Sequence, residues 1–282
     1  MRIYVLAATA AVLAAPALAA DAVPADPVPV YQSDMRGSVA DWEGLYVKGQ
    51  LGYLWNDFRG ATYSVSGGTA DLDGELDDSW YAGVGVGYQI NPYLRTELMF
   101  DYMFDTDFTG STVGLCGAGG GGLVACTSTD TSTWNAYTLM ASVYVDLDFW
   151  SAGSASGSGW GYIVPFIGGG IGGTYGDWDP LTNTACQTAD PTICETFTHP
   201  GESGWRFAWQ LEAGASYYFR CDFAGEASYR YRRIEGGPMF GYQAFTGPGW
   251  DDGIGVQSVN VGLRYYPGRD CYVPPVVPPV YK

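Results

Sequence analysis

The single histidine of the chain, His199, lies four residues before Ser203. A serine with a nearby histidine is the pair that many hydrolases use for nucleophilic attack, provided that rigid elements hold the two side chains within hydrogen-bonding distance. Both residues fall in a Pro- and Gly-containing segment where we expect a loop and no strand. The sequence therefore predicts no catalytic residue, and it indicates no cofactor.

An acidic segment, Asp71-Leu-Asp-Gly-Glu-Leu-Asp-Asp78, begins like a calcium-binding loop. It lacks the glutamate that such a loop carries at its twelfth position, and no helices are expected beside it. We therefore expect a solvated acidic loop and no metal site. Weak binding of divalent cations next to lipopolysaccharide is the alternative.

Six cysteines allow fifteen pairings, and an exported chain could oxidise them. Neighbours within one expected loop are favoured, which leaves a third pair at the opposite rim. The expected disulfides are Cys116–Cys126, Cys186–Cys194 and Cys221–Cys271. A metal centre is disfavoured, because no Cys-x-x-Cys spacing occurs and there is only one histidine.

Charged residues alternate with apolar ones in several short segments. In residues 94–104 the even positions are apolar or threonine, whereas the odd positions include Arg95, Glu97 and Asp101. Side chains of a strand point alternately to two faces, so this segment is a ribbon with one apolar and one charged side. A soluble sandwich would bury the apolar face against a second sheet, whereas a membrane barrel turns it to lipid and keeps the charges inside.

The same alternation, bounded by turn residues, predicts eight strands: 44–55, 80–90, 94–104, 133–149, 162–175, 205–219, 223–233 and 256–266. The two faces of the fifth strand stay unassigned, because both are apolar or glycine. Short connections follow the second and sixth strands, and long polar ones follow the first, third, fifth and seventh. The sequence therefore predicts an all-β fold: an eight-stranded antiparallel transmembrane β-barrel of the up-and-down type over residues 42–267, with short periplasmic turns and long external loops.

The charged faces of these strands would project into the barrel lumen. The expected lumen set is Lys48, Gln50, Arg95, Glu97, Asp101, Asp146, Arg206, Glu212, Glu226, Arg230, Arg232 and Arg264. Side chains just fill the interior of a barrel of this strand number, so mixed charges there should pair into a plug. A narrow gated pore is the alternative.

The two ends of the chain carry different signals. One charge, Arg2, precedes an apolar run and a small-residue stretch, which is the layout of a cleaved secretory signal peptide. We expect a signal peptide over residues 1–20, a Pro-rich periplasmic tether over 21–41 and a Pro-rich periplasmic tail over 268–282. Removing Arg2 takes the formal charge from −17 to −18, which disfavours a nucleic-acid partner.

Three segments resemble a known family: residues 44–53 (GLYVKGQLGY), 83–97 (GVGVGYQINPYLRTE) and 258–265 (SVNVGLRY). They are similar to the porin-like, opacity-type small outer-membrane barrels of Gram-negative bacteria, particularly the immunogenic surface proteins of alphaproteobacteria. The resemblance implies an outer-membrane location and a structural or surface-interaction role without catalytic residues. In that family the last strand commonly ends the chain on an aromatic residue read by the barrel-assembly machinery, whereas a Pro-rich tail follows Tyr266 here.

These features together predict a non-enzymatic outer-membrane barrel that contributes to envelope integrity and displays surface loops. Two alternatives stay open: a narrow diffusion pore for small solutes or ions, and an adhesin that binds a host surface. The expected partners are outer-membrane lipid, lipopolysaccharide and the barrel-assembly machinery, together with a host or surface ligand that the sequence does not name.

Overall fold

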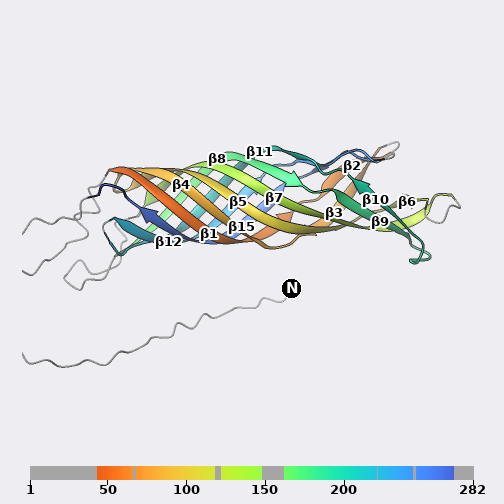
Figure 1. Cartoon of the computed structure of the whole chain (residues 1–282), viewed down its shortest axis with the longest axis horizontal. Helices are drawn as coiled ribbons and strands as arrows, with labels where there is room; N and C mark the ends of the chain where they lie inside the picture. Colours follow the sequence, from red (N-terminus) through yellow and green to blue (C-terminus); the bar gives the residue numbers. More distant parts are fainter. Residues whose placement is uncertain are drawn as a thin grey trace, which may run out of the picture. The chain divides into compact units, whose positions relative to one another are not determined.

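Eight antiparallel strands hydrogen-bond in a closed ring, in the order β1, β4, β5, β7, β8, β11, β12, β15 and back to β1 (Figure 1). Their bounds are β1 (Gly44–Phe58), β4 (Ser79–Asn91), β5 (Leu94–Ser111), β7 (Val124–Asp146), β8 (Tyr162–Trp178), β11 (Ser203–Tyr218), β12 (Phe223–Ile234) and β15 (Ile254–Tyr265). All eight strands predicted from alternation are therefore present, and the eight-stranded antiparallel barrel is confirmed.

The computed structural model describes residues 43–65, 68–117, 122–147, 162–220, 222–243 and 246–269, all within one compact unit, Ser33–Tyr272. The expected signal peptide, tether and most of the tail lie outside the described residues and stay predictions. Among the described residues, no helix is long and apolar enough to cross a membrane.

The outward face of the ring is apolar, as the alternation predicted. Leu98, Leu139 and Leu211 lie near mid-strand on this face and are 46%, 44% and 59% exposed. Aromatic rings gather at the two ends of this apolar band, for example Tyr53 against Trp80 at the outer end. Amphipathic rings prefer the interfaces of a membrane, so the band between them is the lipid-facing wall.

Strand β8, whose faces the sequence left open, is oriented by its neighbours. Val164, Phe166, Thr174 and Trp178 point inward and are buried. The stretch between Phe166 and Thr174 is rich in glycine, and a side chain at Gly168 would collide with the ring of Tyr144 on β7. These glycines therefore make room inside the barrel for large side chains of the adjacent strand.

The external connections are long, as predicted, but much of their described part forms strands where the sequence predicted loops. They form β2 (Ala61–Val65), β3 (Gly68–Leu76), β6 (Val113–Cys116), β9 (Leu181–Gln187), β10 (Cys194–His199), β13 (Gly237–Phe240) and β14 (Gly249–Asp251). Strands β3, β6 and β9 pair directly with β5 or β7, so the wall continues beyond the apolar band (Figure 1). The expectation failed because these strands carry only a few buried apolar residues each, such as Leu72 and Leu76 on β3.

A bulge in β5 reverses which residues point inward. Up to Met103 the odd positions are buried, whereas from Thr106 onward the even positions are buried. An extra residue in one strand of an antiparallel pair shifts its alternation in this way. Phe108 therefore faces the interior, although the pattern in residues 94–104 would place it outside.

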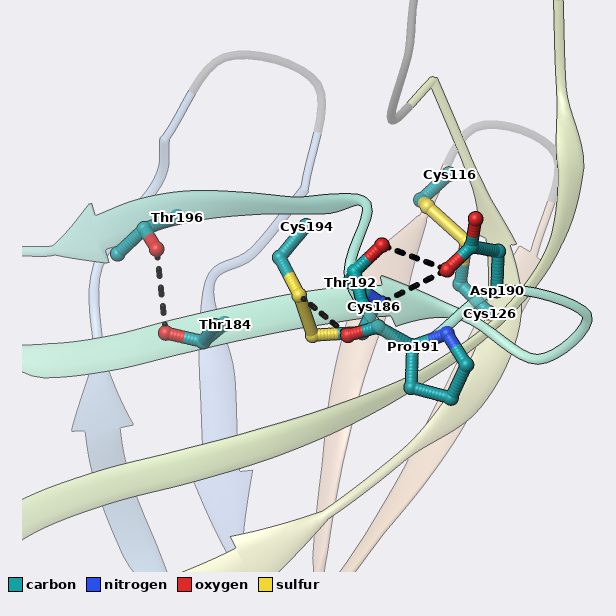
Figure 2. The surroundings of a disulfide bond; sticks show 9 residues. All are labelled: Cys116, Cys126, Thr184, Cys186, Asp190, Pro191, Thr192, Cys194 and Thr196. Carbon is teal, nitrogen blue, oxygen red and sulfur yellow. Dashed lines mark hydrogen bonds between the residues drawn. A yellow bond between two sulfur atoms is a disulfide. The ribbon is translucent and has the colours of Figure 1, made fainter.

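Two disulfides brace the outer strands (Figure 2). Cys116–Cys126 joins β6 to β7, and Cys186–Cys194 joins β9 to β10. The two bonds are neighbours, because Thr127 on β7 is paired with Cys186 on β9. Both expected local pairs are present, whereas Cys221 and Cys271 lie outside the described residues, so that pairing stays a prediction.

We expect Leu98→Arg, Leu139→Arg or Leu211→Arg to destabilise the barrel by about 2–4 kcal/mol, because each places a cation near the bilayer midplane. Urea unfolding after reconstitution into lipid vesicles measures this. Val113→Arg is the matched control, since Val113 is 79% exposed on β6 outside the apolar band. Equal losses at Val113 and Leu98 would show that the apolar band does not face lipid.

Peptide mapping without reductant should recover Cys116 joined to Cys126 and Cys186 joined to Cys194. Reduction should destabilise each outer hairpin by about 2–3 kcal/mol, because closing a loop of this length lowers the conformational entropy of the unfolded state. The reduced hairpins should then be cleaved more readily by protease. The ring should stay folded and keep its heat-modifiable gel migration, since neither bond joins strands across it. A Cys116–Cys194 link, or free thiols at these positions, would contradict the assignment.

Candidate functional site

The barrel interior is the site that the sequence singled out, and its charges form two clusters at different heights. The inner charge cluster, nearer the short turns, consists of Lys48, Arg95, Glu97, Asp146, Glu226 and Arg264. The outer charge cluster consists of Asp101, Glu212, Arg230 and Arg232. All ten side chains are buried.

Glu226 on β12 is the centre of the inner charge cluster. Its carboxylate lies 2.9 Å from Nζ of Lys48 and 2.5 Å from Nη2 of Arg264. Arg95 reaches the same carboxylate at 3.3 Å and also lies 3.0 Å from Asp146. Three cations thus share three carboxylates, and the cluster is neutral as a whole.

The outer charge cluster is also neutral. Asp101 pairs with Arg232 at 2.5 Å and with Arg230 at 3.4 Å. Arg230 lies 3.0 Å from Glu212, whose other oxygen accepts a hydrogen bond from the Ser228 hydroxyl at 2.6 Å. Each cluster therefore compensates its own charge, as burial in a narrow interior requires.

Tyrosines also belong to this network, and the sequence analysis, whose lumen set held charged residues and Gln50, missed them. The Tyr144 hydroxyl donates to Glu212 at 2.9 Å, and the ring of Tyr144 lies 4.2 Å below the Arg95 guanidinium. The Tyr46 hydroxyl donates to Glu97 at 3.1 Å. Strand parity could have found both rings, because each has the same parity as the inward charges of its strand.

Glycines on β4 decide how these large side chains fit. Three glycines of β4 each lie close to a large side chain: Gly83 to Asp101, Gly85 to Met99 and Gly87 to the ring of Tyr46. A Cβ atom at any of these glycines would collide with that side chain. Because β4 contributes almost no volume at these levels, side chains from β1 and β5 can extend across the lumen.

Arg206 was expected in the same set, but it lies apart from both clusters. It pairs with Asp251 on β14 at 2.6 Å and donates to the carbonyl oxygen of Pro238 at 2.7 Å. Burial raises the pKa of Asp251, an effect that the nearby Arg206 opposes. Sequence reasoning missed this partner, because Asp251 lies in a connection that we expected to be a loop.

Apolar layers lie on both sides of the charge clusters. The inner layer consists of Tyr46, Val164, Tyr218, Ala224 and Tyr266. The outer layer, which we call the outer plug, contains Leu54, Met103, Phe108, Trp134, Met140, Trp178, Met239 and Phe240 among others. The rings of Phe108 and Trp178 meet edge to face at 5.6 Å. The charges are thus enclosed between two packed apolar layers.

The serine and histidine that could form a hydrolytic pair are both held by strands, contrary to expectation. His199 ends β10 and Ser203 begins β11. Ser203 is hydrogen-bonded to the Tyr175 hydroxyl at 2.8 Å, and the ring of His199 is bonded to the Gly241 carbonyl oxygen and the Thr246 hydroxyl. None of the hydrogen bonds between described residues joins the serine to the histidine.

The acidic segment at residues 71–78 is largely strand β3 and not a loop. Leu72 and Leu76 are buried and fix its orientation, while the acidic residues between them point away from the interior or lie at its edge. Within the described part of the chain, no group of three or more His, Cys, Asp or Glu side chains is placed to hold a metal ion.

Comparisons with known proteins agree with this architecture. The family model for the outer membrane protein β-barrel domain matches residues 5–266. An uncharacterized protein of Brucella abortus is 31% identical over 256 residues, which cover 79% of this chain and 84% of the relative.

Similar solved structures are more distant in sequence. Outer membrane protein OprG from Pseudomonas aeruginosa has a TM-score of 0.46 and 12% identity, over 81% of this chain and 99% of that one. Neisserial surface protein A has a TM-score of 0.39 and 14% identity, over 80% of this chain and 99% of that one. The family match confirms the resemblance seen in the sequence: the chain belongs to the outer membrane protein β-barrel family, and it is a protein of the outer membrane.

Proposed function

We propose that this protein is a closed, non-enzymatic barrel that strengthens the outer membrane and holds a disulfide-braced surface outside it. The packed interior carries this proposal: neutral charge clusters lie between two apolar layers. A diffusion pore needs a continuous hydrated path, whereas the buried charges of these clusters pair directly with one another.

The geometry of the charges supports a plug over a pore. Within the two clusters the paired nitrogen and oxygen atoms lie 2.5–3.5 Å apart, so they are in direct contact. Charges that line a channel keep their water and attract ions of the opposite sign. Neutral, mutually paired clusters offer a passing ion no such site.

The outer plug adds a second obstacle. Trp134 and Trp178 are fully buried and their ring centroids lie 6.2 Å apart, with Phe108 packed against Trp178. A solute would have to displace these rings before it reached the charges. Loss of their packing would cost several kcal/mol, since removing even one large buried ring costs about 3–5 kcal/mol.

A surface-binding role is the second candidate, and a specific feature favours it. Val113, Leu115 and Leu123 are strongly exposed on or beside the β6–β7 hairpin, outside the lipid-facing band. Exposed apolar groups of this kind suit contact with another surface. A triple serine variant at these positions should reduce attachment of cells to a host surface if the protein is an adhesin, and should leave attachment unchanged if its role is structural.

Planar-bilayer recording of the full chain tests the closed barrel. We expect no stepwise conductance, with heat-modifiable gel migration from the same reconstituted sample as proof that folded barrels are present. Reproducible single-channel currents from folded protein would contradict the proposal and favour the diffusion pore.

Glu212→Gln distinguishes plug from pore in a single variant. It removes the charge that faces Arg230, so we expect the barrel to lose about 3–5 kcal/mol of unfolding free energy, the usual consequence of leaving a buried charge without its partner. Urea unfolding in vesicles measures the loss, and bilayer recording should still show no current. Glu75→Gln on β3, an exposed position, is the control and should change neither measurement.

If Glu212→Gln changes the current or the ion selectivity and leaves the unfolding midpoint unchanged, the closed-barrel proposal is contradicted. That result would mean that Arg230 and Glu212 are hydrated, as charges in a conducting lumen are.

A further inference from the structure

A pocket of about 360 Å³ lies among the outer strands, beyond the lipid-facing band. Its walls are mostly apolar and include Leu72 on β3, Leu181 on β9, Phe197 on β10 and Phe240 on β13. Strands β6, β7 and β9 form one side, where the Cys116–Cys126 disulfide is part of the lining (Figure 2). The volume is in the range of pockets that hold small organic molecules.

Asp130 lines this pocket and is the polar group that sets its chemistry. It points inward from β7 and is 1% exposed. One carboxylate oxygen accepts a hydrogen bond from the Ser128 hydroxyl at 2.8 Å, and the other accepts one from the Asn183 amide. Both donors are neutral, so the carboxylate is oriented but its charge is not compensated.

Asp130 differs in this respect from every other buried carboxylate of the described residues. The seven buried acidic side chains are Glu97, Asp101, Asp130, Asp146, Glu212, Glu226 and Asp251. Six of them pair with a lysine or arginine within 4 Å, and no described lysine or arginine pairs with Asp130. A buried charge without a partner is costly, so this site is suited to a cation from outside the chain.

His199, which also lines the pocket, makes its hydrogen bonds to groups other than Asp130. Its Nδ1 lies 3.2 Å from the Gly241 carbonyl oxygen, to which it donates, and its Nε2 lies 3.4 Å from the Thr246 hydroxyl. Burial lowers the pKa of His199 and raises the pKa of Asp130. Burial therefore disfavours the charged imidazolium that could otherwise pair with Asp130.

A metal ion fits the site poorly. Hard divalent cations take six or more oxygen ligands, commonly from several carboxylates. The described part of the chain places no such group of acidic side chains here. An ammonium group needs only a few acceptors, and its apolar substituent would pack against Leu72, Leu181 and Phe240.

We propose that this pocket binds a small organic cation, an ammonium group on an apolar body, with the ammonium on Asp130 and the body against the apolar walls. Glu195 at the pocket edge and the formal charge of −17 would draw such a cation to the outer surface. The site is separate from the charge clusters of the lumen, so the proposal stands whether or not the barrel conducts.

Three probes of similar size and different charge test the proposal on the full chain in lipid nanodiscs: phenethylammonium, neutral 2-phenylethanol and anionic 3-phenylpropionate. Isothermal titration calorimetry should show the ammonium binding about tenfold or more tighter than the alcohol, the scale of a hydrogen bond to a charged group, and no binding of the anion. This comparison uses the unaltered protein and depends on no variant. Equal binding of ammonium and alcohol, or no binding of either, would overturn the proposal.

Asp130→Asn then locates the cation. It should lower the phenethylammonium affinity about tenfold or more and leave 2-phenylethanol binding unchanged. Asp190→Asn is the matched control, because Asp190 lies in the exposed β9–β10 turn and is absent from the pocket lining. Retained ammonium binding in folded Asp130→Asn would refute the assignment, as would Asp130-dependent binding of calcium chloride with no response to phenethylammonium.

Discussion

A ring of eight strands has room inside for side chains and for little else, and this geometric limit governs the structure. A charge that the strand alternation turns inward is buried there, so an opposite charge within the lumen lowers the cost of its burial. Glu226 provides this opposite charge for Lys48, Arg95 and Arg264 at once. The inward glycines of β4 reflect the same limit, because they leave space in which larger side chains from adjacent strands can meet.

The barrel could be predicted from the sequence because its signal is local. Alternation within a single segment shows which side chains face lipid, and a short turn such as that before Leu94 shows which strands are neighbours. Arg230 and Arg232 were placed in the lumen on parity alone, and the structure puts both there. What parity does not provide is the partner across the lumen, because that depends on how far the strands are staggered around the ring.

The outer region could not be predicted, since its order depends on contacts between distant segments. The role of Asp251 can be recognised only from its contact with Arg206, which is 45 residues earlier in the chain. Asp130 likewise stood in a stretch that we assigned to a polar loop, and its isolation from cations is visible only once the wall has closed around it. Short strands with one or two buried residues carry too little periodicity to be recognised one at a time.

The bulge in β5 marks the height at which the surroundings of that strand change. Below the bulge the outward residues face lipid and most inward residues face the charge clusters, with Met103 already in the outer plug. Above the bulge the inward residues face the outer plug and the outward residues lie beyond the lipid-facing band. A strand of constant parity would turn Asp105 and Asp107 into the plug and leave the ring of Phe108 in solvent. One additional residue thus adapts a single continuous strand to two environments. The bulge shifts the inward and outward alternation of β5 by one residue at the height where its surroundings change.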